Sequence, residues 1–404
     1  MVRRPPRLAI VTTHPVQYYA PVFRELAGAG AVVPHVFYGW TGAASGEALD
    51  RGFGTSFEWD IPLLEGYDHT FVPNVSGDPG THHFGGINGP SLVSEIEAWA
   101  PDAVLVYGWN YRSHLRALRH FHGRLPVLFR GDSTLTDEGR GLKSAARTLV
   151  RRGFLRWVYR HVDLALYVGQ RNREYFRAHG LSEAQLAWAP HSVENARFEE
   201  GPNVRYEEEA SAWRMDLGIG PADRAILFAG KLESKKAPEV LLDAYQRAFS
   251  AIDERRQVHL LFVGTGPMDD LLRARAEADP RVHFLGFQNQ SRMPVAYRLG
   301  DVFALPSRGP GETWGLAVNE AMACGRPVVV ADPVGCAPDL VDIANGAVVP
   351  ADNASALASA LQRVLSDAGA MGDVSARRIA AWSIPEQARR IEAAALAITR
   401  PERD

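Results

Sequence analysis

Cysteine is scarce in this sequence, and so are long apolar runs and any excess of charge of one sign. The 404 residues contain two cysteines, Cys324 and Cys336, with no histidine pair or second CxxC nearby, so a disulfide framework or a zinc site is not expected. No stretch reaches the roughly 18 apolar residues of a membrane span. The formal net charge is -3, which gives no reason to expect nucleic acid as a partner.

The apolar run near the N-terminus is short. It follows several arginines, as in a signal peptide, but it ends at His14-Pro15 after about six positions, a length more typical of a β-strand. We therefore expect a cytoplasmic protein.

Two series of alternating strands and helices follow one another along the chain. The first runs from the apolar strand Leu8–Thr13 to the strand Val127–Phe129 and beyond, and the second from Ala225–Ala229 to Val328–Ala331. The glycine-rich stretch up to residue 90 has no assignable pattern. Alternation of this kind predicts an α/β protein with two Rossmann-like domains, each built on a parallel, doubly wound sheet.

The chain turns polar from His191 to about Asp223, which marks the predicted domain boundary. We expect an N-terminal domain at 1–195, a C-terminal domain at 196–382 and a final helical segment at 383–404. That last helix has Ser383 as a plausible N-cap and Pro385 in its first turn.

The string GETWGLAVNEAMACGRPVVVAD carries the clearest chemical signal. Gly311 and Gly315 let the backbone approach a ligand closely, and the helix that begins near Leu316 offers its free N–H groups to an anion. Glu320 lies one turn into that helix, where it suits a vicinal diol, and Glu312 in the loop suits sugar hydroxyls. The alternative is a helix N-terminus stabilised by acidic residues through its dipole.

With its E-x7-E loop and helix, this string resembles the signature of the family 4 retaining glycosyltransferases of GT-B fold. The motifs ILFAGKLESKKAPEVLLDAY, LLFVGTGP and VHFLGFQNQ occur in the order seen in that family. APHSVENARF is similar to its interdomain segment and YVGQRNREYF to the last helix region of its first domain. HPVQYYAP resembles a subgroup that begins HPIQY.

The resemblance implies two domains that face each other across a cleft, with the donor held by the second, the acceptor by the first, and the last helix crossing back to the first. It implies transfer from a nucleotide-sugar, with a UDP-sugar favoured, to a hydroxyl of a glycan, a lipid-linked or a small-molecule acceptor such as a secondary metabolite. Retention of configuration is expected, with no metal and no cofactor. Polysaccharide biosynthesis is the favoured setting.

The donor side follows from these motifs residue by residue. Lys231 and Lys236 are expected to neutralise the departing diphosphate and so to act in catalysis with Glu312. The loop Gly286, Phe287 and Gln288 is expected to hold the base through backbone groups. The full donor-binding set is Lys231, Lys236, Gly286, Phe287, Gln288, Glu312, Thr313, Trp314, Gly315, Leu316 and Glu320.

Acceptor residues are expected where strands of the first domain end, because open α/β sheets bind ligands at their carboxyl edge. His14 and Asp132 are the catalytic candidates there. Packing of the tyrosines on the sheet and capping of the next helix by Asp132 are the alternatives. The predicted acceptor-binding set is His14, Gln17, Tyr18, Trp109, Asn110, Arg112, Arg130 and Asp132.

The helix at 140–160 is basic and carries no acidic residue. Its cations recur mostly at steps of three and four, namely Arg140, Lys143, Arg147, Arg151, Arg152, Arg156 and Arg160. Such a helix is suited to peripheral contact with the inner face of an anionic membrane. A solvated basic face is the alternative.

Three other functions share features of this architecture. A nucleotide-sugar epimerase or a non-catalytic nucleotide-sugar-binding protein would keep the donor site. An NAD-dependent enzyme would need a dinucleotide fingerprint, and Gly264-Thr265-Gly266 lacks its third glycine.

Overall fold

The computed structural model describes residues 4–42, 48–50, 55–57, 59–138, 142–201, 204–250 and 257–399. The chain forms two compact units. The first comprises Met1–Ala48, Ile61–His191 and Ile384–Asp404, and the second comprises Leu49–Asp60 and Ser192–Ser383. Within the described part of the chain, no helix is long and apolar enough to cross a membrane.

In the first unit, seven described strands form one sheet in the order β5-β2-β1-β6-β7-β8-β9. Every pairing in it is parallel, as predicted. β1 lies inside the sheet, between β2 and β6, and is almost fully buried, as expected for a parallel sheet covered on both faces. The strands are β1 (Arg7–Thr12), β2 (Val33–Tyr38), β5 (His69–Phe71), β6 (Ala103–Tyr107), β7 (Val127–Arg130), β8 (Leu164–Tyr167) and β9 (Leu186–Trp188).

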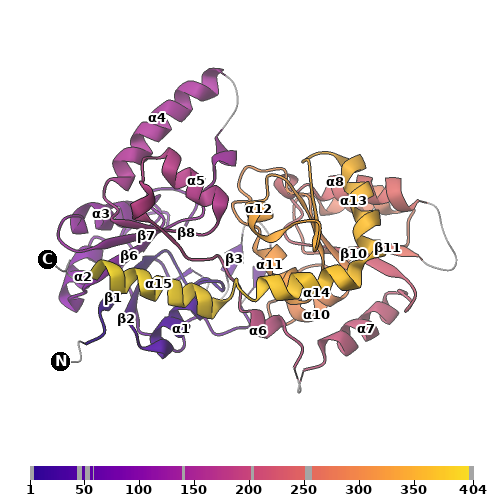
Figure 1. Ribbon diagram of the computed structural model, residues 1–404, viewed down its shortest axis with the longest axis horizontal. Coiled ribbons are helices and arrows are strands. Elements are labelled where there is room, and N and C mark those ends of the chain that lie inside the picture. The colour runs from indigo at the N-terminus through magenta and orange to yellow at the C-terminus, as the bar shows by residue number, and fades with distance from the viewer. Residues whose placement is uncertain are drawn as a thin grey trace. The chain divides into compact units, whose positions relative to one another are not determined.

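The helices of the first unit cover both faces of this sheet (Figure 1). They are α1 (Ala20–Ala29), α2 (Leu92–Trp99), α3 (Arg112–Phe121), α4 (Leu142–Tyr159), α5 (Gln170–Ala178) and α15 (Ile384–Thr399). Helix α15 packs against α1, and its Arg390 guanidinium lies 4.8 Å from the ring centre of Trp188. The predicted return of the last helix to the first domain is therefore confirmed (Figure 1).

Strand β5 lies in the glycine-rich stretch that had no assignable pattern. It has three residues, each partly buried, and pairs with β2 at the edge of the sheet. So short a strand shows no alternation of apolar and polar residues, which explains why the sequence does not indicate it.

The second unit repeats the design with six described strands in the order β12-β11-β10-β13-β14-β15, all parallel. These strands are β10 (Arg224–Ala229), β11 (Val258–Val263), β12 (Val282–Phe284), β13 (Val302–Leu305), β14 (Val328–Ala331) and β15 (Gly346–Val349). Strands β3 (Ala48–Asp50) and β4 (Thr55–Phe57) form a separate pair.

The helices of the second unit include two within the polar stretch where only a boundary was expected. These are α6 (Asn195–Phe198) and α7 (Tyr206–Asp216). The three glutamates in the first turn of α7 suit the positive end of its dipole. The others are α8 (Pro238–Phe249), α9 (Asp269–Ala276), α10 (Met293–Arg298), α11 (Leu316–Ala323), α12 (Ala337–Leu340), α13 (Ala354–Ser366) and α14 (Ala368–Ile379).

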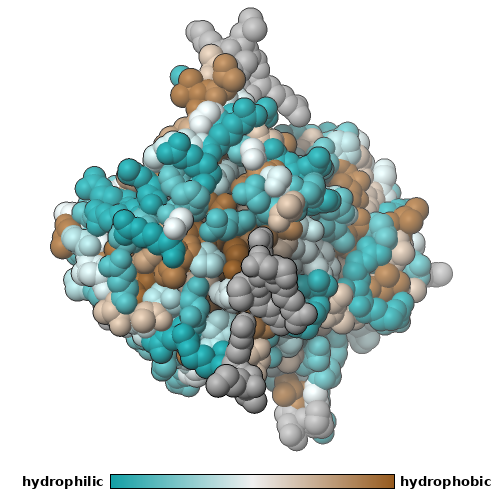
Figure 2. All heavy atoms as spheres, turned by 60° about the vertical axis from the view of Figure 1, so that its left-hand side comes forward, coloured by the Kyte–Doolittle hydropathy of each residue, from teal (hydrophilic) through white to brown (hydrophobic). Residues whose placement is uncertain are grey.

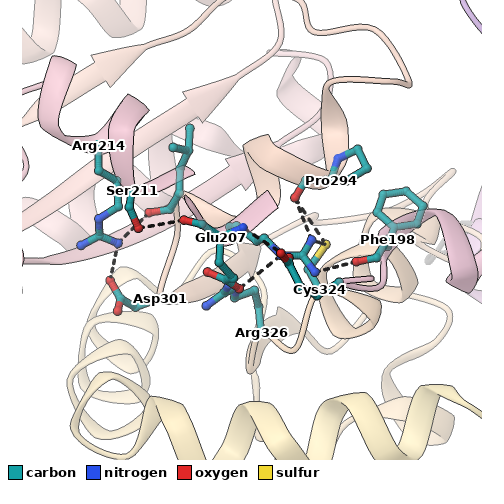
Figure 3. Close-up of polar contacts among 11 residues, drawn as sticks. Phe198, Glu207, Ser211, Arg214, Pro294, Asp301, Cys324 and Arg326 are labelled. Carbon is teal, nitrogen blue, oxygen red and sulfur yellow. Dashed lines mark hydrogen bonds and ion pairs between the residues drawn. The ribbon is translucent and has the colours of Figure 1, made fainter. Parts of the chain in front are cut away.

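A buried arginine, Arg298, fastens three of these helices together. Its guanidinium donates to the carbonyl oxygens of Pro294 at 2.9 Å and Phe198 at 2.7 Å, and to the Sγ of Cys324 at 3.2 Å. Its Nε lies 3.2 Å from a Glu207 carboxylate oxygen. Figure 3 shows Phe198, Pro294 and Cys324 grouped around this point. Because Cys324 ends α11, the guanidinium fixes the C-terminal end of that helix.

Candidate functional site

Residues of the predicted donor set lie at the carboxyl edge of the sheet in the second unit. The strand order reverses between β10 and β13, and open α/β sheets bind ligands at such switch points. The segment after β10 carries Lys231 and Lys236, and the loop after β13 carries Glu312. Two segments far apart in sequence are thus brought to the same sheet edge.

The ion pair between Lys236 and Glu312 joins these two loops. The Lys236 Nζ lies 2.6 Å from a Glu312 carboxylate oxygen, and both side chains are largely buried. The Ser307 hydroxyl donates to the same oxygen at 3.0 Å. The lysine stem also passes close to Gly230, where an added Cβ would lie 3.2 Å from Lys236 Cδ. The ammonium group is therefore held in one place at the end of β10.

Helix α11 begins at this loop. Its N-cap is Gly315, which has a φ of 96°, a conformation that costs a non-glycine residue free energy. A side chain there would also meet Val334 at 2.9 Å. The Val318 N–H donates to the Gly315 carbonyl at 2.9 Å, whereas the N–H groups of Leu316 and Ala317 precede the first intrahelical bonds, where a helix offers them to an anion.

Trp314 and Asn319 have structural roles within this loop and helix. The Trp314 indole is buried, donates from Nε1 to the Asn319 side-chain oxygen at 2.9 Å, and packs on Trp382 with ring centres 5.1 Å apart. The Trp314 side chain thus fastens the loop to the core. A contact between Trp314 and the donor, as predicted, would have to come from its backbone.

Glu320 is 3% exposed and accepts a hydrogen bond of 2.6 Å from the Tyr297 hydroxyl. Tyr297 belongs to α10 and is itself buried. The contact between Glu320 and a diol stays a prediction, and the geometry adds that this carboxylate also joins two helices.

The loop of the predicted base contact follows β12. The Gly286 carbonyl accepts from the Gly264 N–H at 2.7 Å, and the Gln288 side-chain amide donates to the Leu285 carbonyl at 2.8 Å. A Cβ at Gly264 would lie 2.1 Å from the Gly230 carbonyl oxygen. The glycines therefore let three loops pack closely at the same sheet edge.

The first unit has a cavity of about 220 Å³ at the carboxyl edge of its own sheet. The strand order reverses there between β1 and β6. Asn110, Arg130 and Asp132 were predicted and do line it. The full lining is Thr12, Thr13, Tyr19, Tyr107, Gly108, Asn110, Tyr111, Arg130, Gly131, Asp132, Val168 and His191.

In the described loop after β1, the cavity is lined by Tyr19, whereas His14, Gln17 and Tyr18 are not among its lining residues. Tyr19 lies against Tyr107, with ring centres 4.9 Å apart, and stacks on His191 at 6.4 Å. Burial raises the pKa of Tyr19 above its usual value, and Asp132 raises it further. This loop therefore reaches the cavity through Thr13 and Tyr19, and the acceptor contacts of His14, Gln17 and Tyr18 stay predictions.

His14 is partly buried beside this cavity. Its Nδ1 lies 2.9 Å from the Thr13 hydroxyl, and its ring packs against Trp40. Burial lowers the pKa of His14 to about 4, so the imidazole is neutral at pH 7. A catalytic role for His14 stays a prediction.

Arg130 positions the segment that carries His191. It is 3% exposed, and its guanidinium donates to the carbonyls of Ala189 at 2.9 Å and Pro190 at 2.8 Å. Burial first, and the neighbouring Arg130 second, lower the pKa of His191 to about 4. The sequence does not predict His191 as a site residue, because the motif that contains it, APHSVENARF, indicates only a domain boundary.

A second cavity of about 350 Å³ shares Gly108, Asn110, Gly131 and Asp132 with the first. Its other lining residues are Trp109, Phe129, Ser133, Arg151, Tyr159, Tyr175 and Phe176. Asp132 thus borders both cavities. It is not the N-cap of the next helical turn, Leu135–Asp137, because Thr134 takes that position.

Arg112 is exposed at the start of α3, where its backbone N–H donates to the Phe84 carbonyl at 3.0 Å. The lining residues of the two cavities do not include it. Its predicted contact with an acceptor is therefore not supported by these cavities.

Among the described residues, Asp78, His82 and His83 bring three potential metal-ligand atoms within 4.8 Å of one another. All three are exposed. Their ring nitrogens already contact Asp78, since His82 Nε2 lies 2.9 Å from its carboxylate and His83 Nε2 lies 2.9 Å from its carbonyl. This group lies between β5 and α2, outside both cavities.

Three buried histidines make the fold sensitive to acid. Burial lowers the pKa of His114, His191 and His259 to about 4 each. In the unfolded chain they take up protons near pH 6.5, so the unfolded state binds more protons between about pH 6.5 and pH 4. We therefore expect the free energy of unfolding to decrease as the pH is lowered through this window. Urea denaturation at pH 7, 6 and 5 measures it.

The matched variants for this effect are His259→Gln, which should flatten the pH dependence, and His122→Gln at an exposed position, which should not. A wild-type stability that is constant from pH 7 to pH 5 would contradict the expectation.

Known proteins share sequence and fold with this chain. Residues 223–367 match the family model described as glycosyl transferases group 1, which confirms the resemblance seen in the motifs. An uncharacterized glycosyltransferase of Methanocaldococcus jannaschii is 34% identical over 170 residues, covering 41% of this chain and 42% of the relative.

A second relative is the GDP-mannose-dependent monoacylated alpha-(1-6)-phosphatidylinositol monomannoside mannosyltransferase of Corynebacterium glutamicum. It is 30% identical over 242 residues, covering 57% of this chain and 61% of the relative. The chain therefore spans about half the length of these curated relatives.

Among solved structures, Anabaena HepE in complex with UDP is similar over 97% of this chain and 99% of HepE. The TM-score is 0.70 and the sequence identity 18%. A likeness at this identity supports the fold, and it agrees with the two Rossmann-like units predicted from the sequence.

Proposed function

We propose that the protein transfers a sugar from a nucleotide-sugar donor to an acceptor hydroxyl, on the premise that residues 223–367 match the family model of the group 1 glycosyl transferases. The observation that carries the proposal is the set of groups at the β10/β13 switch point. Lys236, held by Glu312, and the N-terminus of α11 converge there. Such a combination of a cation and helix N–H groups suits a diphosphate.

The donor is proposed to bind to the second unit. Its diphosphate lies against the N–H groups that begin α11 and near Lys231 and Lys236, and its base lies against the backbone of the loop at Gly286. A UDP-sugar is the favoured donor, since HepE, which has a similar fold, was solved with UDP. No metal takes part, because the lysines and the helix N-terminus supply the positive charge that a bound cation supplies elsewhere.

The acceptor is proposed to bind in the cavities of the first unit. Asp132 borders both of them, which supports the proposal that its carboxylate orients a hydroxyl. Tyr19, Tyr107 and Tyr111 supply ring faces and hydroxyls to the first cavity, which suits a polar, ring-shaped molecule such as a sugar. A glycan, a lipid-linked or a small-molecule acceptor meets this description.

Transfer is proposed to retain the anomeric configuration. The bond between the anomeric carbon and the diphosphate oxygen breaks, and the electron pair leaves with the diphosphate. The acceptor oxygen bonds to the same face of the sugar, and its proton passes to a diphosphate oxygen. Lys231 and Lys236 stabilise the charge that grows on the leaving diphosphate, which is the main contribution of the protein.

A panel of UDP-, GDP-, ADP- and dTDP-sugars tests the donor. We expect one of them, most readily a UDP-sugar, to raise the apparent Tm, because a ligand that binds the folded state stabilises it by mass action. The shift should persist in EDTA and should be lost in Lys236→Ala. Transfer of label from that donor to a glycan or lipid product distinguishes a transferase from an epimerase or a binding protein.

No shift with any donor at millimolar concentration, or a shift that needs a divalent metal, would contradict the donor assignment.

A further inference from the structure

Helix α4 has an apolar stripe that faces away from its own unit. Ala146, Leu149, Val150, Gly153 and Phe154 recur at the spacing of one helix face. Leu149 is 73% exposed, Val150 74% and Phe154 42%. Ala146, Val150 and Phe154 of this stripe line an open groove of about 530 Å³. Exposure of contiguous large apolar side chains marks an interaction surface.

The opposite face of the same helix is buried. Leu155 and Val158 are 0% exposed and Tyr159 is 2% exposed within the core of the first unit. The C-terminal half of α4 is therefore fixed to the sheet, while its N-terminal half projects from the unit (Figure 1). Figure 2 shows hydrophobic atoms gathered on this projection, at the top of the view. The stripe is therefore presented by a firmly anchored helix.

Arginines border the stripe on both sides. Arg147 and Arg151 are exposed on one side and Arg156 on the other. Among the described residues, the ion pairs of this helix involve Arg152 alone, which contacts the Glu138 carboxylate at 2.5 Å. Glu138 in turn lies 3.4 Å from His179. The border of the stripe thus keeps a net positive charge.

The apolar stripe and the arginines beside it together indicate which kind of partner fits this surface. An apolar face bordered by arginines fits the boundary between acyl chains and anionic head groups. A second copy of the chain on the same face would bring Arg147 and Arg151 against the same cations, which is unfavourable. Both arginines also line the groove itself. The charge pattern therefore favours an anionic lipid surface.

We propose that the apolar stripe of α4, with Arg147 and Arg151 beside it, docks the protein on an anionic lipid bilayer. The stripe inserts among the lipid chains near the head groups, and the arginines contact lipid phosphates. Arg151 lines both the groove on α4 and the second cavity, and Phe154 packs on Trp109 of that cavity with ring centres 5.4 Å apart. Docking would hold that cavity next to the bilayer.

Vesicle flotation of the full chain tests this directly, without any nucleotide-sugar. The probes are vesicles of phosphatidylcholine alone and of equal parts phosphatidylcholine and phosphatidylglycerol. We expect flotation with the anionic vesicles at about 0.1 M salt, less at high salt, and little with the neutral ones. The double variants Leu149→Ser/Val150→Ser and Arg147→Glu/Arg151→Glu should each bind roughly tenfold or more weakly.

The matched controls lie in the second unit. Ile343→Ser removes an exposed apolar side chain and Arg247→Glu reverses an exposed charge, and both should float like the wild type. The α4 variants change exposed positions, so their Tm should be unchanged, which separates lost docking from misfolding. Absence of flotation with anionic vesicles, or equal flotation of the α4 variants, would overturn the proposal. Donor-induced shifts in Tm do not bear on it, so the two proposals can fail separately.

Discussion

Replacing Lys236 with alanine is expected to lower kcat/KM for sugar transfer about 100-fold or more, the usual cost of removing one group that stabilises transition-state charge. The ammonium group is held at the β10/β13 switch point by Glu312 at 2.6 Å. Positive charge placed in advance costs no reorganisation when the diphosphate leaves. Initial rates over a range of donor concentrations measure the effect.

The neighbouring residue provides a matched control. The Lys235 side chain is more exposed, and its Nζ lies 3.2 Å from a Glu233 carboxylate oxygen. Lys235→Ala should therefore leave kcat/KM within about twofold, as expected for an exposed pair. Equal losses of kcat/KM in Lys235→Ala and Lys236→Ala would indicate that the overall positive charge of the segment matters, and not the position of the Lys236 ammonium group. No loss in Lys236→Ala would remove this residue from the donor site.

Replacing Arg298 with methionine is expected to reduce the free energy of unfolding by about 3 kcal/mol, because buried hydrogen-bond acceptors are left without their donor. The change leaves the buried carbonyl oxygens of Phe198 and Pro294 without their guanidinium donor. It also releases the Cys324 end of α11. Urea denaturation measures the difference, with the same dependence of the unfolding free energy on urea concentration assumed for both proteins.

An exposed arginine of the same unit serves for comparison. Arg205 pairs with Glu208 at 3.0 Å, with both side chains largely exposed, and Arg205→Met should change the stability by about 0.5 kcal/mol or less. If Arg298→Met were as mild, the contacts of Arg298 would be incidental to the stability of the fold.

The donor side could be predicted in outline because its groups come in short contiguous motifs. Glycines, lysines and the start of α11 each lie in a recognisable string, and strand alternation indicates which sheet edge they share. The pairing of Lys236 with Glu312 could not be predicted, because it depends on β10 and β13 being neighbours. The sequence predicts Glu312 against the sugar, and the structure adds that its carboxylate pairs with Lys236.

The acceptor side was harder to predict because its cavity is assembled from the ends of β1, β6, β7, β8 and β9. Each strand end contributes one to three side chains without a motif. Tyr18 and Tyr19 are adjacent and chemically identical, and only the turn that bonds the Tyr19 N–H to the Val16 carbonyl decides their directions. For His191, the signal available was its position directly after the strand-like LAWAP.

The return of α15 has a consequence for folding during synthesis. Ile391, Ala388 and Ala395 of this helix are buried within the first unit, and Arg390 covers Trp188 at the end of β9. The ribosome makes α15 only after the whole second unit. Chains emerge from the ribosome N-terminal end first. The sheet of the first unit therefore has one apolar patch that stays uncovered until α15 is made, whereas all strands of the second unit have already been synthesised by then. The unit that begins first is therefore the one that is completed last.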